Sequence, residues 1–163
     1  MDFLNVGQVL SNLDLKDSMS AAEFGCGAAD FSIALAKKLN KGRVYALDIQ
    51  EEKLSALKAK IAHQHVKNIL TVHGDLEAKG GSGLQNGQLD VVLITNVLFQ
   101  AENKDKILQE AVRVIKPGGR VLVIDWFEKV KPEAVKALAH QSGLSLEKEF
   151  AAGDHHYGLV FTK

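Results

Sequence analysis

The feature that most constrains this chain is a regular alternation of apolar, strand-like segments with segments of helical periodicity. Five apolar segments predict strands, at residues 20–24, 44–47, 69–72, 89–94 and 121–124. Between and after them, apolar residues recur every three or four positions, which predicts helices beginning near Asp30, Glu51, Asn103 and Pro132. Asp30 is the expected N-cap of its helix, and the Pro117-Gly118-Gly119 turn is expected to end the third helix. Glu110 and Lys116 are interpreted as solvated charges of that third helix. Parallel neighbouring strands need helix-length connections. The alternation therefore predicts a mostly parallel sheet with helices on both faces.

The two ends of the chain depart from this alternation. Over 144–150 apolar and polar residues alternate loosely, and residues 157–161 are apolar again after a Gly153-Asp154 turn, which predicts a closing antiparallel hairpin and seven strands in all. At the other end, apolar residues at helical spacing predict a helix over 3–13, within an N-terminal cap of residues 1–19. A length of 163 residues predicts one domain over 1–163.

Composition excludes several functional classes. Twenty basic and twenty acidic residues cancel, so no overall field favours nucleic acid or an anionic surface. No segment is long and apolar enough for membrane insertion. The single cysteine excludes an internal disulfide, and no Cys/His cluster has metal-site spacing, which predicts a cytoplasmic protein without a bound metal.

A glycine turn connects the first predicted strand to the first long helix. Its sequence is Glu23-Phe24-Gly25-Cys26-Gly27. Gly25 allows the backbone to bend, and Gly27 allows a ligand to lie against the main chain. Ala29 stands where dinucleotide-binding turns carry a third glycine. Cys26 is interpreted as a small side chain beside the ligand rather than a nucleophile, because no basic neighbour is close in sequence.

Polar residues follow the carboxyl ends of all five predicted strands, where ligands bind in open parallel sheets. Asp48 follows the glycines by about 20 residues, the spacing of an acid that binds ribose hydroxyls. Taken singly, Asp48 is equally suited to helix capping and Asp75 to a turn. We expect the following residues to share one rim of the sheet: Glu23, Asp48, Asp75, Asn96 and Asp125.

With these motifs the chain resembles the class I S-adenosylmethionine-dependent methyltransferases, closest to the group of ubiquinone and menaquinone biosynthesis. Besides the glycine turn and Asp48, the resemblance rests on Gly74-Asp75-Leu76 and on the segment 114–120, Val-Ile-Lys-Pro-Gly-Gly-Arg. It implies a Rossmann-like, doubly wound sheet of seven strands, mostly parallel with an antiparallel C-terminal hairpin. It also implies S-adenosylmethionine as cofactor and methyl transfer to a small-molecule acceptor.

The resemblance assigns roles to the residues at the strand ends. It implies that Asp48 accepts both ribose hydroxyls and that Ile49 packs on adenine. It places Asp75 at the adenine amino group and the backbone of Leu76 at the ring edge. The remaining implied contacts lie toward the methionine part: Glu23 near the ammonium group, Gly25, Cys26 and Gly27 along the chain, and Asn96 and Val97 at its methyl end.

The acceptor side carries fewer signals. Methyl transfer needs mainly alignment, and a base only if the acceptor holds its proton. His155, His156 and Tyr157 are the candidates for that base, with a polar hairpin tip as the competing interpretation. Short connections leave little chain for a lid. We therefore expect an open site, a pocket completed by the N-terminal helix or a homodimer partner, or a large acceptor, with an apolar wall from Phe99, Trp126 and Phe127.

Two other functions remain open from the sequence. A nicotinamide-dependent oxidoreductase shares the glycine turn and the ribose acid, but the third glycine and a separate substrate domain are missing. A non-catalytic module that binds S-adenosylmethionine would need no acceptor pocket.

Overall fold

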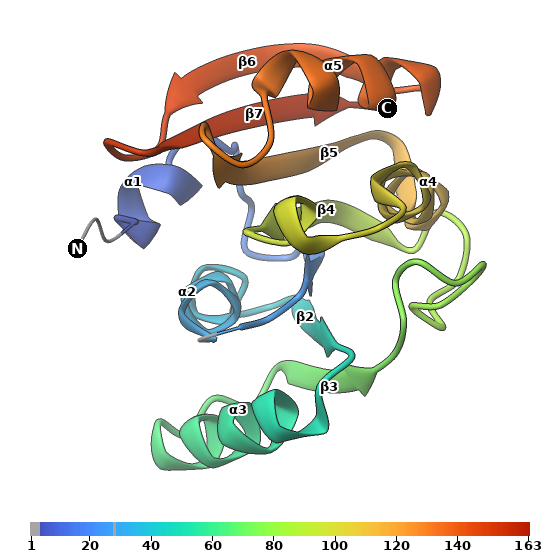
Figure 1. Ribbon diagram of the computed structural model, residues 1–163. Coiled ribbons are helices and arrows are strands. Elements are labelled where there is room, and N and C mark those ends of the chain that lie inside the picture. Colours follow the sequence, from blue (N-terminus) through green and yellow to red (C-terminus); the bar gives the residue numbers. More distant parts are fainter. Residues whose placement is uncertain (1–3, 28) are drawn as a thin grey trace.

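The computed structural model describes residues 4–27 and 29–163, and its centre is a seven-stranded sheet flanked by helices (Figure 1). The strands are β1 (Ser20–Phe24), β2 (Arg43–Asp48), β3 (Ile69–His73), β4 (Leu89–Thr95), β5 (Ile115–Trp126), β6 (Ser145–Ala151) and β7 (His156–Thr162). The helices are α1 (Val6–Leu10), α2 (Asp30–Lys38), α3 (Glu51–His63), α4 (Lys104–Val114) and α5 (Pro132–Gln141), with a 3-10 turn, η1 (Leu98–Gln100).

The strand order is β3-β2-β1-β4-β5-β7-β6. The first five strands of this order pair in parallel, whereas β7 pairs antiparallel with both β5 and β6. The predicted fold class is confirmed, including the C-terminal hairpin. Since the chain starts at β1 in the middle and winds outward in both directions, a topological switch point lies between β1 and β4, where ligands bind in such sheets.

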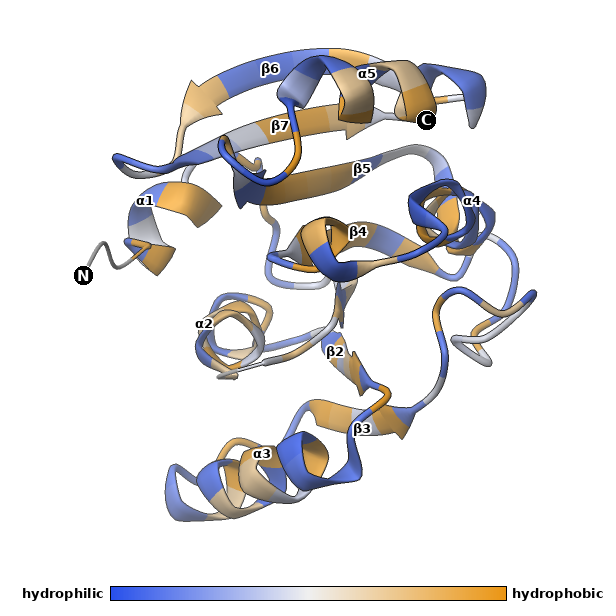
Figure 2. Ribbon diagram, in the orientation of Figure 1, coloured by the Kyte–Doolittle hydropathy of each residue, from blue (hydrophilic) through white to orange (hydrophobic). Residues whose placement is uncertain are grey.

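Two apolar layers hold the sheet between its helices. One face carries α4 and α5, whose buried residues pack with those of β1, β4, β5 and β7. The other face carries α1 and α2, with α3 beside β2 and β3. Residues 91–94 of β4 and 121–124 of β5 are continuously apolar and buried, as the orange parts of these strands in Figure 2 show, because both faces of the sheet are covered there. None of the described helices could span a membrane.

Several local predictions were wrong, for identifiable reasons. Helix α1 covers only five residues of the predicted 3–13, and Phe3 lies outside the described residues. Asp30 does not cap α2: it is the first helical residue and forms an ion pair with Lys60 at 3.0 Å, whereas the capping position belongs to Ala29. Helix α4 ends at Val114, before the Pro-Gly-Gly turn, because Ile115 already pairs with β4.

Candidate ligand-binding site

A cavity of about 730 Å³ opens at the carboxyl ends of the parallel strands. This volume lies within the range of roughly 300–1,000 Å³ that is usual for small-molecule sites. Ten residues implied as cofactor contacts line it: Glu23, Gly25, Cys26, Gly27, Asp48, Ile49, Asp75, Leu76, Asn96 and Val97. The structure thus brings Glu23, Asp48, Asp75 and Asn96 to one rim, as expected, but not Asp125.

The glycine turn takes its shape from two positive φ angles, +78° at Gly25 and +44° at Gly27. The backbone N–H groups of Gly25 and Cys26 both donate to the carbonyl of Leu47 at 2.9 Å, which fixes the turn against the end of β2. A Cβ on Gly25 would lie 2.4 Å from Cγ2 of Val97, whereas one on Gly27 would meet nothing within 4 Å. Gly25 is thus required by the protein itself, and Gly27 leaves the main chain open to the cavity.

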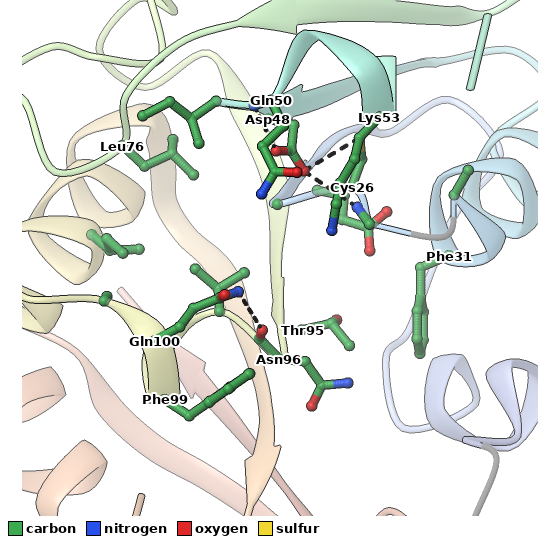
Figure 3. Close-up of a pocket in the computed structure, with 18 of the residues that line it drawn as sticks. Cys26, Phe31, Asp48, Gln50, Lys53, Leu76, Thr95, Asn96, Phe99 and Gln100 are labelled. Atoms are coloured by element: carbon green, nitrogen blue, oxygen red, sulfur yellow. Dashed lines mark hydrogen bonds between the residues drawn. The ribbon is translucent and has the colours of Figure 1, made fainter. Parts of the chain in front are cut away.

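Asp48 is held at the end of β2 by short polar contacts. Its Oδ1 accepts from the backbone N–H of Gln50 at 3.0 Å, and its Oδ2 accepts from that of Gly27 at 3.4 Å and from the thiol of Cys26 at 3.9 Å. Lys53, one turn into α3, also lines the cavity beside these groups (Figure 3). Asp48 therefore presents an oriented carboxylate, and Lys53 adds a positive charge that no sequence motif marked.

Glu23 lies deeper, with only 3 % of its surface exposed. Its Oε1 accepts a hydrogen bond from the hydroxyl of Ser32 at 2.6 Å. Burial raises the pKa of Glu23 to about 8, and the negative charges of Asp30 and Asp48 act in the same direction, against the hydrogen bonds from Ser32. Burial and Asp48 likewise raise the pKa of Cys26 to about 12, so its thiol stays neutral, as the space-filling interpretation requires.

The segments that follow β2 and β3 form another wall of the cavity. Gly74 donates to the carbonyl of Asp48 at 3.2 Å, and His73 Nε2 lies 2.8 Å from the carbonyl oxygen of Ile49. Ile49 leaves 59 % of its surface exposed and lines the cavity, so it offers apolar surface to a ligand. Asp75 is exposed in the cavity and accepts from the N–H of Glu77 at 2.9 Å.

At the end of β4, the chain turns sharply at Asn96, whose φ is +57°. The Oγ1 of Thr95 and the Oδ1 of Asn96 are buried and have no hydrogen-bond partner among the residues that the structure describes. Both side chains lie between Phe31 and Phe99 in the lower half of Figure 3. Buried oxygens without donors are costly, so this part of the cavity is suited to a ligand that donates or is positively charged.

Of the three residues proposed for the acceptor side, only one lines the cavity. His156 lines the cavity and is buried, and its ring lies 3.9 Å from that of Trp126. His155 is exposed outside the cavity. Tyr157 is fully buried on β7, and Phe127 packs on it at 5.2 Å between ring centroids. His155 and Tyr157 are thus not brought to the cavity, because residues on a strand alternate in direction and the turn points His155 outward.

The apolar wall contains Phe99 and Trp126, but not Phe127. Leu4 and Val6, at the start of α1, line the cavity as well, in agreement with the expected pocket completed by the N-terminal helix. Asp125 was expected on the rim but is fully buried beneath it, where its carboxylate accepts from the N–H of Phe99 at 3.2 Å and of Trp126 at 2.9 Å. Asp125 therefore holds the backbone of the aromatic wall and does not line the cavity.

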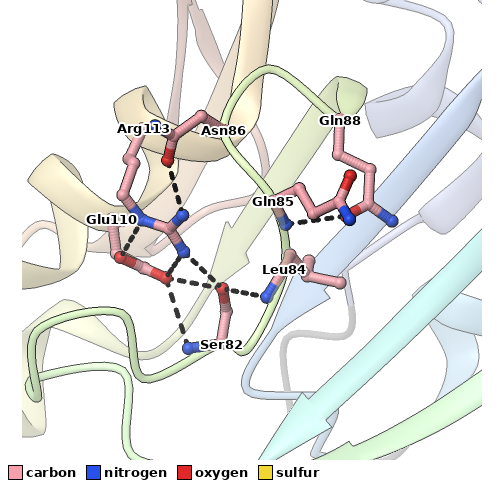
Figure 4. Close-up of polar contacts among 7 residues, drawn as sticks. All are labelled: Ser82, Leu84, Gln85, Asn86, Gln88, Glu110 and Arg113. Atoms are coloured by element: carbon pink, nitrogen blue, oxygen red, sulfur yellow. Dashed lines mark hydrogen bonds and ion pairs between the residues drawn. The ribbon is translucent and has the colours of Figure 1, made fainter.

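The loop between β3 and β4 is anchored outside the cavity by a partly buried ion pair on α4 (Figure 4). Arg113 donates to both carboxylate oxygens of Glu110, and the hydroxyl of Ser82 donates to Oε1 at 2.5 Å. Burial alone would raise the pKa of Glu110, but these hydrogen bonds lower it. The interpretation of Glu110 and Lys116 as solvated helix charges was wrong for Glu110, which is buried. Lys116 is exposed, but it belongs to β5 rather than to the helix and pairs with Asp90 at 3.2 Å.

Comparison with known proteins adds independent findings. A family described as a methyltransferase domain matches residues 15–155. The demethylmenaquinone methyltransferases of Bacillus mycoides (strain KBAB4) and Bacillus cereus (strain ATCC 10987 / NRS 248) are each 32% identical over 114 residues, which is 69% of this chain and 47% of theirs. The chain spans about half the length of these curated relatives.

Solved structures show the same fold at lower identity. A SAM-dependent methyltransferase of Aquifex aeolicus superposes with a TM-score of 0.87 at 24% identity, covering 97% of this chain and 89% of that one. The cyclase SpnF superposes with a TM-score of 0.85 at 11% identity, covering 97% and 80%. Because a cyclase shares the fold, the architecture alone does not determine the reaction.

Proposed function

The chain belongs to the methyltransferase-domain family, and on that premise we propose that it binds S-adenosylmethionine and transfers its methyl group to a small-molecule acceptor. The observation that carries the proposal is the convergence of Asp48, Asp75 and the open backbone of Gly27 on one cavity. A carboxylate at the end of β2 suits a vicinal diol, and a second after β3 suits an amino group on a flat ring. The exposed Ile49 supplies the apolar surface for that ring.

The residues present fit this cofactor. The oxygens of Thr95 and Asn96 offer acceptors that the protein leaves unused, and Glu23 offers a buried carboxyl group. When bound, the cofactor supplies an already activated methyl group. The chain itself needs to orient donor and acceptor and to exclude water, which positioning by the strand ends and the cover from Leu4 and Val6 would provide.

For the acceptor we propose a small, largely apolar molecule with a flat ring. The relatives are named for methylation of demethylmenaquinone. The cavity's acceptor side is lined by Phe31, Phe99 and Trp126, and flat aromatic surfaces pack well on such rings. His156 is the remaining candidate for a base, because it is the only one of the three predicted residues that lines the cavity.

We further propose that residues 1–163 act as one domain, that the protein works in the cytoplasm, and that any homodimer would leave the cavity open to small molecules. Light scattering of the purified chain gives the oligomeric state directly. No nucleic-acid partner is proposed.

Calorimetric titration with S-adenosylmethionine, S-adenosylhomocysteine and nicotinamide adenine dinucleotide tests the cofactor. Binding of the first two but not the third supports the proposal, and preference for the dinucleotide contradicts it. Transfer of labelled methyl groups to a lipid-soluble cell extract then tests catalysis. Tight cofactor binding without transfer to any fraction would favour the non-catalytic module.

A further inference from the structure

We infer that Glu23 makes the cavity selective for a positively charged ligand: its carboxyl group holds a proton in the ligand-free protein and releases it to solvent when the cation binds. The inference rests on the proposed function, which supplies the cation. Glu23 would then not only contact the ligand but also distinguish charged from neutral ligands.

The first support is the surroundings of the carboxyl group. Glu23 is 97% buried at the end of β1 yet lines the cavity. Its hydrogen-bond donor is the hydroxyl of Ser32, which is itself fully buried on α2. An ionised carboxylate in this position would lose most of its hydration and gain only neutral hydrogen bonds, from the hydroxyl and the backbone N–H of Ser32. Such an environment favours the protonated form.

The second support is the sign of the neighbouring charges. The two charged groups that act on Glu23 are Asp30 on α2 and Asp48 on β2, and both are negative. Burial and these charges raise the pKa of Glu23 to about 8. The other titratable groups that line the cavity are Cys26, whose thiol stays neutral, the basic residues Lys53 and His156, and two acids, Asp75 and Glu77.

A bound cation changes this balance. The O–H bond of the Glu23 carboxyl group breaks, the proton passes to solvent, and the carboxylate remains paired with the ligand's positive group. A ligand without a positive charge offers no such compensation, so the proton stays on Glu23. Pairing in a buried site offsets the desolvation that an isolated carboxylate would suffer. Glu23 thus discriminates between ligands by charge rather than by shape.

Calorimetry measures the released proton. We would titrate the full chain at about pH 6.5 in two buffers of different ionisation enthalpy, because an α-amino group with a pKa of about 7.7–8.0 is then charged. The ligands are S-adenosylmethionine, S-adenosylhomocysteine and 5′-methylthioadenosine, a neutral nucleoside without the amino-acid tail. We expect release of about one proton per molecule of the first two, and none with the third.

Glu23→Gln keeps the size of the side chain and its contact with Ser32 but has no proton to release. We expect this variant to bind S-adenosylhomocysteine roughly tenfold more weakly, without proton release, and methylthioadenosine with unchanged affinity. Glu77→Gln is the matched control: it makes the same substitution in the same cavity, at an acid that accepts from the N–H of Asn103. Because Glu77 itself lines the cavity, Glu52→Gln, at an exposed acid of α3 outside the cavity, is the second control. The Glu52 variant should release the same proton as the unmodified chain.

The outcomes separate the two levels of the proposal. Binding of S-adenosylhomocysteine without proton release, or with equal release in Glu23→Gln, overturns the inference and leaves the cofactor assignment standing. Failure of both adenosyl amino acids to bind overturns both. Should Glu23→Gln fail to fold, the unmodified chain still decides, because equal proton release with methylthioadenosine contradicts a role for the ligand's charge.

Discussion

The two sides of the cavity are built on different principles. Across the sheet from β3 to β7, the lining residues run from Asp75, Asp48 and Glu23 to Asn96, Trp126 and His156. On the first side, carboxylates are oriented by backbone N–H groups. On the second, aromatic rings pack on one another and two oxygens have no donor among the described residues. The polar groups of the first side are oriented without a ligand, whereas the second side offers ring surfaces and unpaired oxygens to which ligands can bind in several ways.

This difference teaches where specificity resides. A side whose polar groups are already oriented can hold one chemical group well and tolerates little change. A side made of ring surfaces accepts several flat molecules of similar size. We therefore expect substitutions on the β2 side to impair cofactor binding, and substitutions on the β5 side to alter the choice of acceptor.

The largest effect is expected from Asp48→Ala. Removal of this carboxylate should weaken the binding of S-adenosylhomocysteine by about 1–3 kcal/mol, because charged hydrogen bonds are lost and the ligand hydroxyls stay unpaired. Calorimetric titration measures the change. Asp17→Ala, which breaks an exposed ion pair with Lys41, is the control and should leave affinity unchanged. Equal affinities for the Asp48 variant and the unmodified chain would refute the ribose assignment.

Gly25→Ala should lower the free energy of unfolding by about 1–2 kcal/mol, since the residue has a φ of +78°. The new Cβ would also collide with Cγ2 of Val97. Denaturant unfolding measures the loss, and adding Val97→Ala should recover the steric part but not the backbone strain. Gly27→Ala, whose Cβ meets only open space, should destabilise less. A larger loss at position 27 would contradict the distinction between the two glycines.

Glu23 should make the stability of the ligand-free protein depend on pH. Its folded pKa of about 8 exceeds the ordinary value of 4.5, so the folded state retains a proton that the unfolded chain loses between these values. The contribution to stability is complete below about pH 4.5 and is lost as the pH rises to about 8, with a slope of about 1.4 kcal/mol per pH unit. Glu23→Gln should remove this slope. Urea titrations of both proteins at several pH values measure the difference, and parallel curves would argue against it.

The smallest effect on cofactor binding is expected from Trp126→Ala. Its ring packs on His156 on the β5 side, away from the carboxylates. The affinity for S-adenosylhomocysteine should change by less than about 0.5 kcal/mol, as for sites without direct contact. Methyl transfer to an extract should fall more strongly, because the acceptor loses a wall. A loss of cofactor affinity equal to that of Asp48→Ala would contradict the proposal that the β2 side binds the cofactor and the β5 side the acceptor.

The sequence allowed most of the β2 side to be predicted, because motifs there express backbone requirements. Gly25 and Asp48 mark a turn and a strand end that recur at fixed spacing, so periodicity and spacing suffice. The β5 side could not be predicted in the same way. Whether His155, His156 or Tyr157 enters the cavity depends on the exact register of β7 against β5, which pairs Trp126 with His156.

Contacts between distant segments also escaped prediction. Lys53 is one of several lysines in its region, and only the packing of α3 beside β2 directs it to the cavity. Glu110 carries the pattern of an exposed helix position, and its burial depends on a loop whose glycines gave no indication that Ser82 would pair with it. Asp125 lies at a strand end like Asp48, but the turn η1 covers it and uses its carboxylate for backbone N–H groups.

The position of β3 gives the proposed cofactor a second role. This strand forms the free edge of the sheet, and none of its five residues is buried. Asp75 lies two residues beyond its end, whereas Asp48 and Glu23 belong to the interior strands β2 and β1. A nucleoside held by Asp48 and Asp75 together would act as a mechanical tie between the margin of the sheet and its centre. Amide hydrogens of the outermost strand should then exchange with solvent more slowly in the liganded protein, because the bound molecule stabilises an edge that the polypeptide alone leaves less stable.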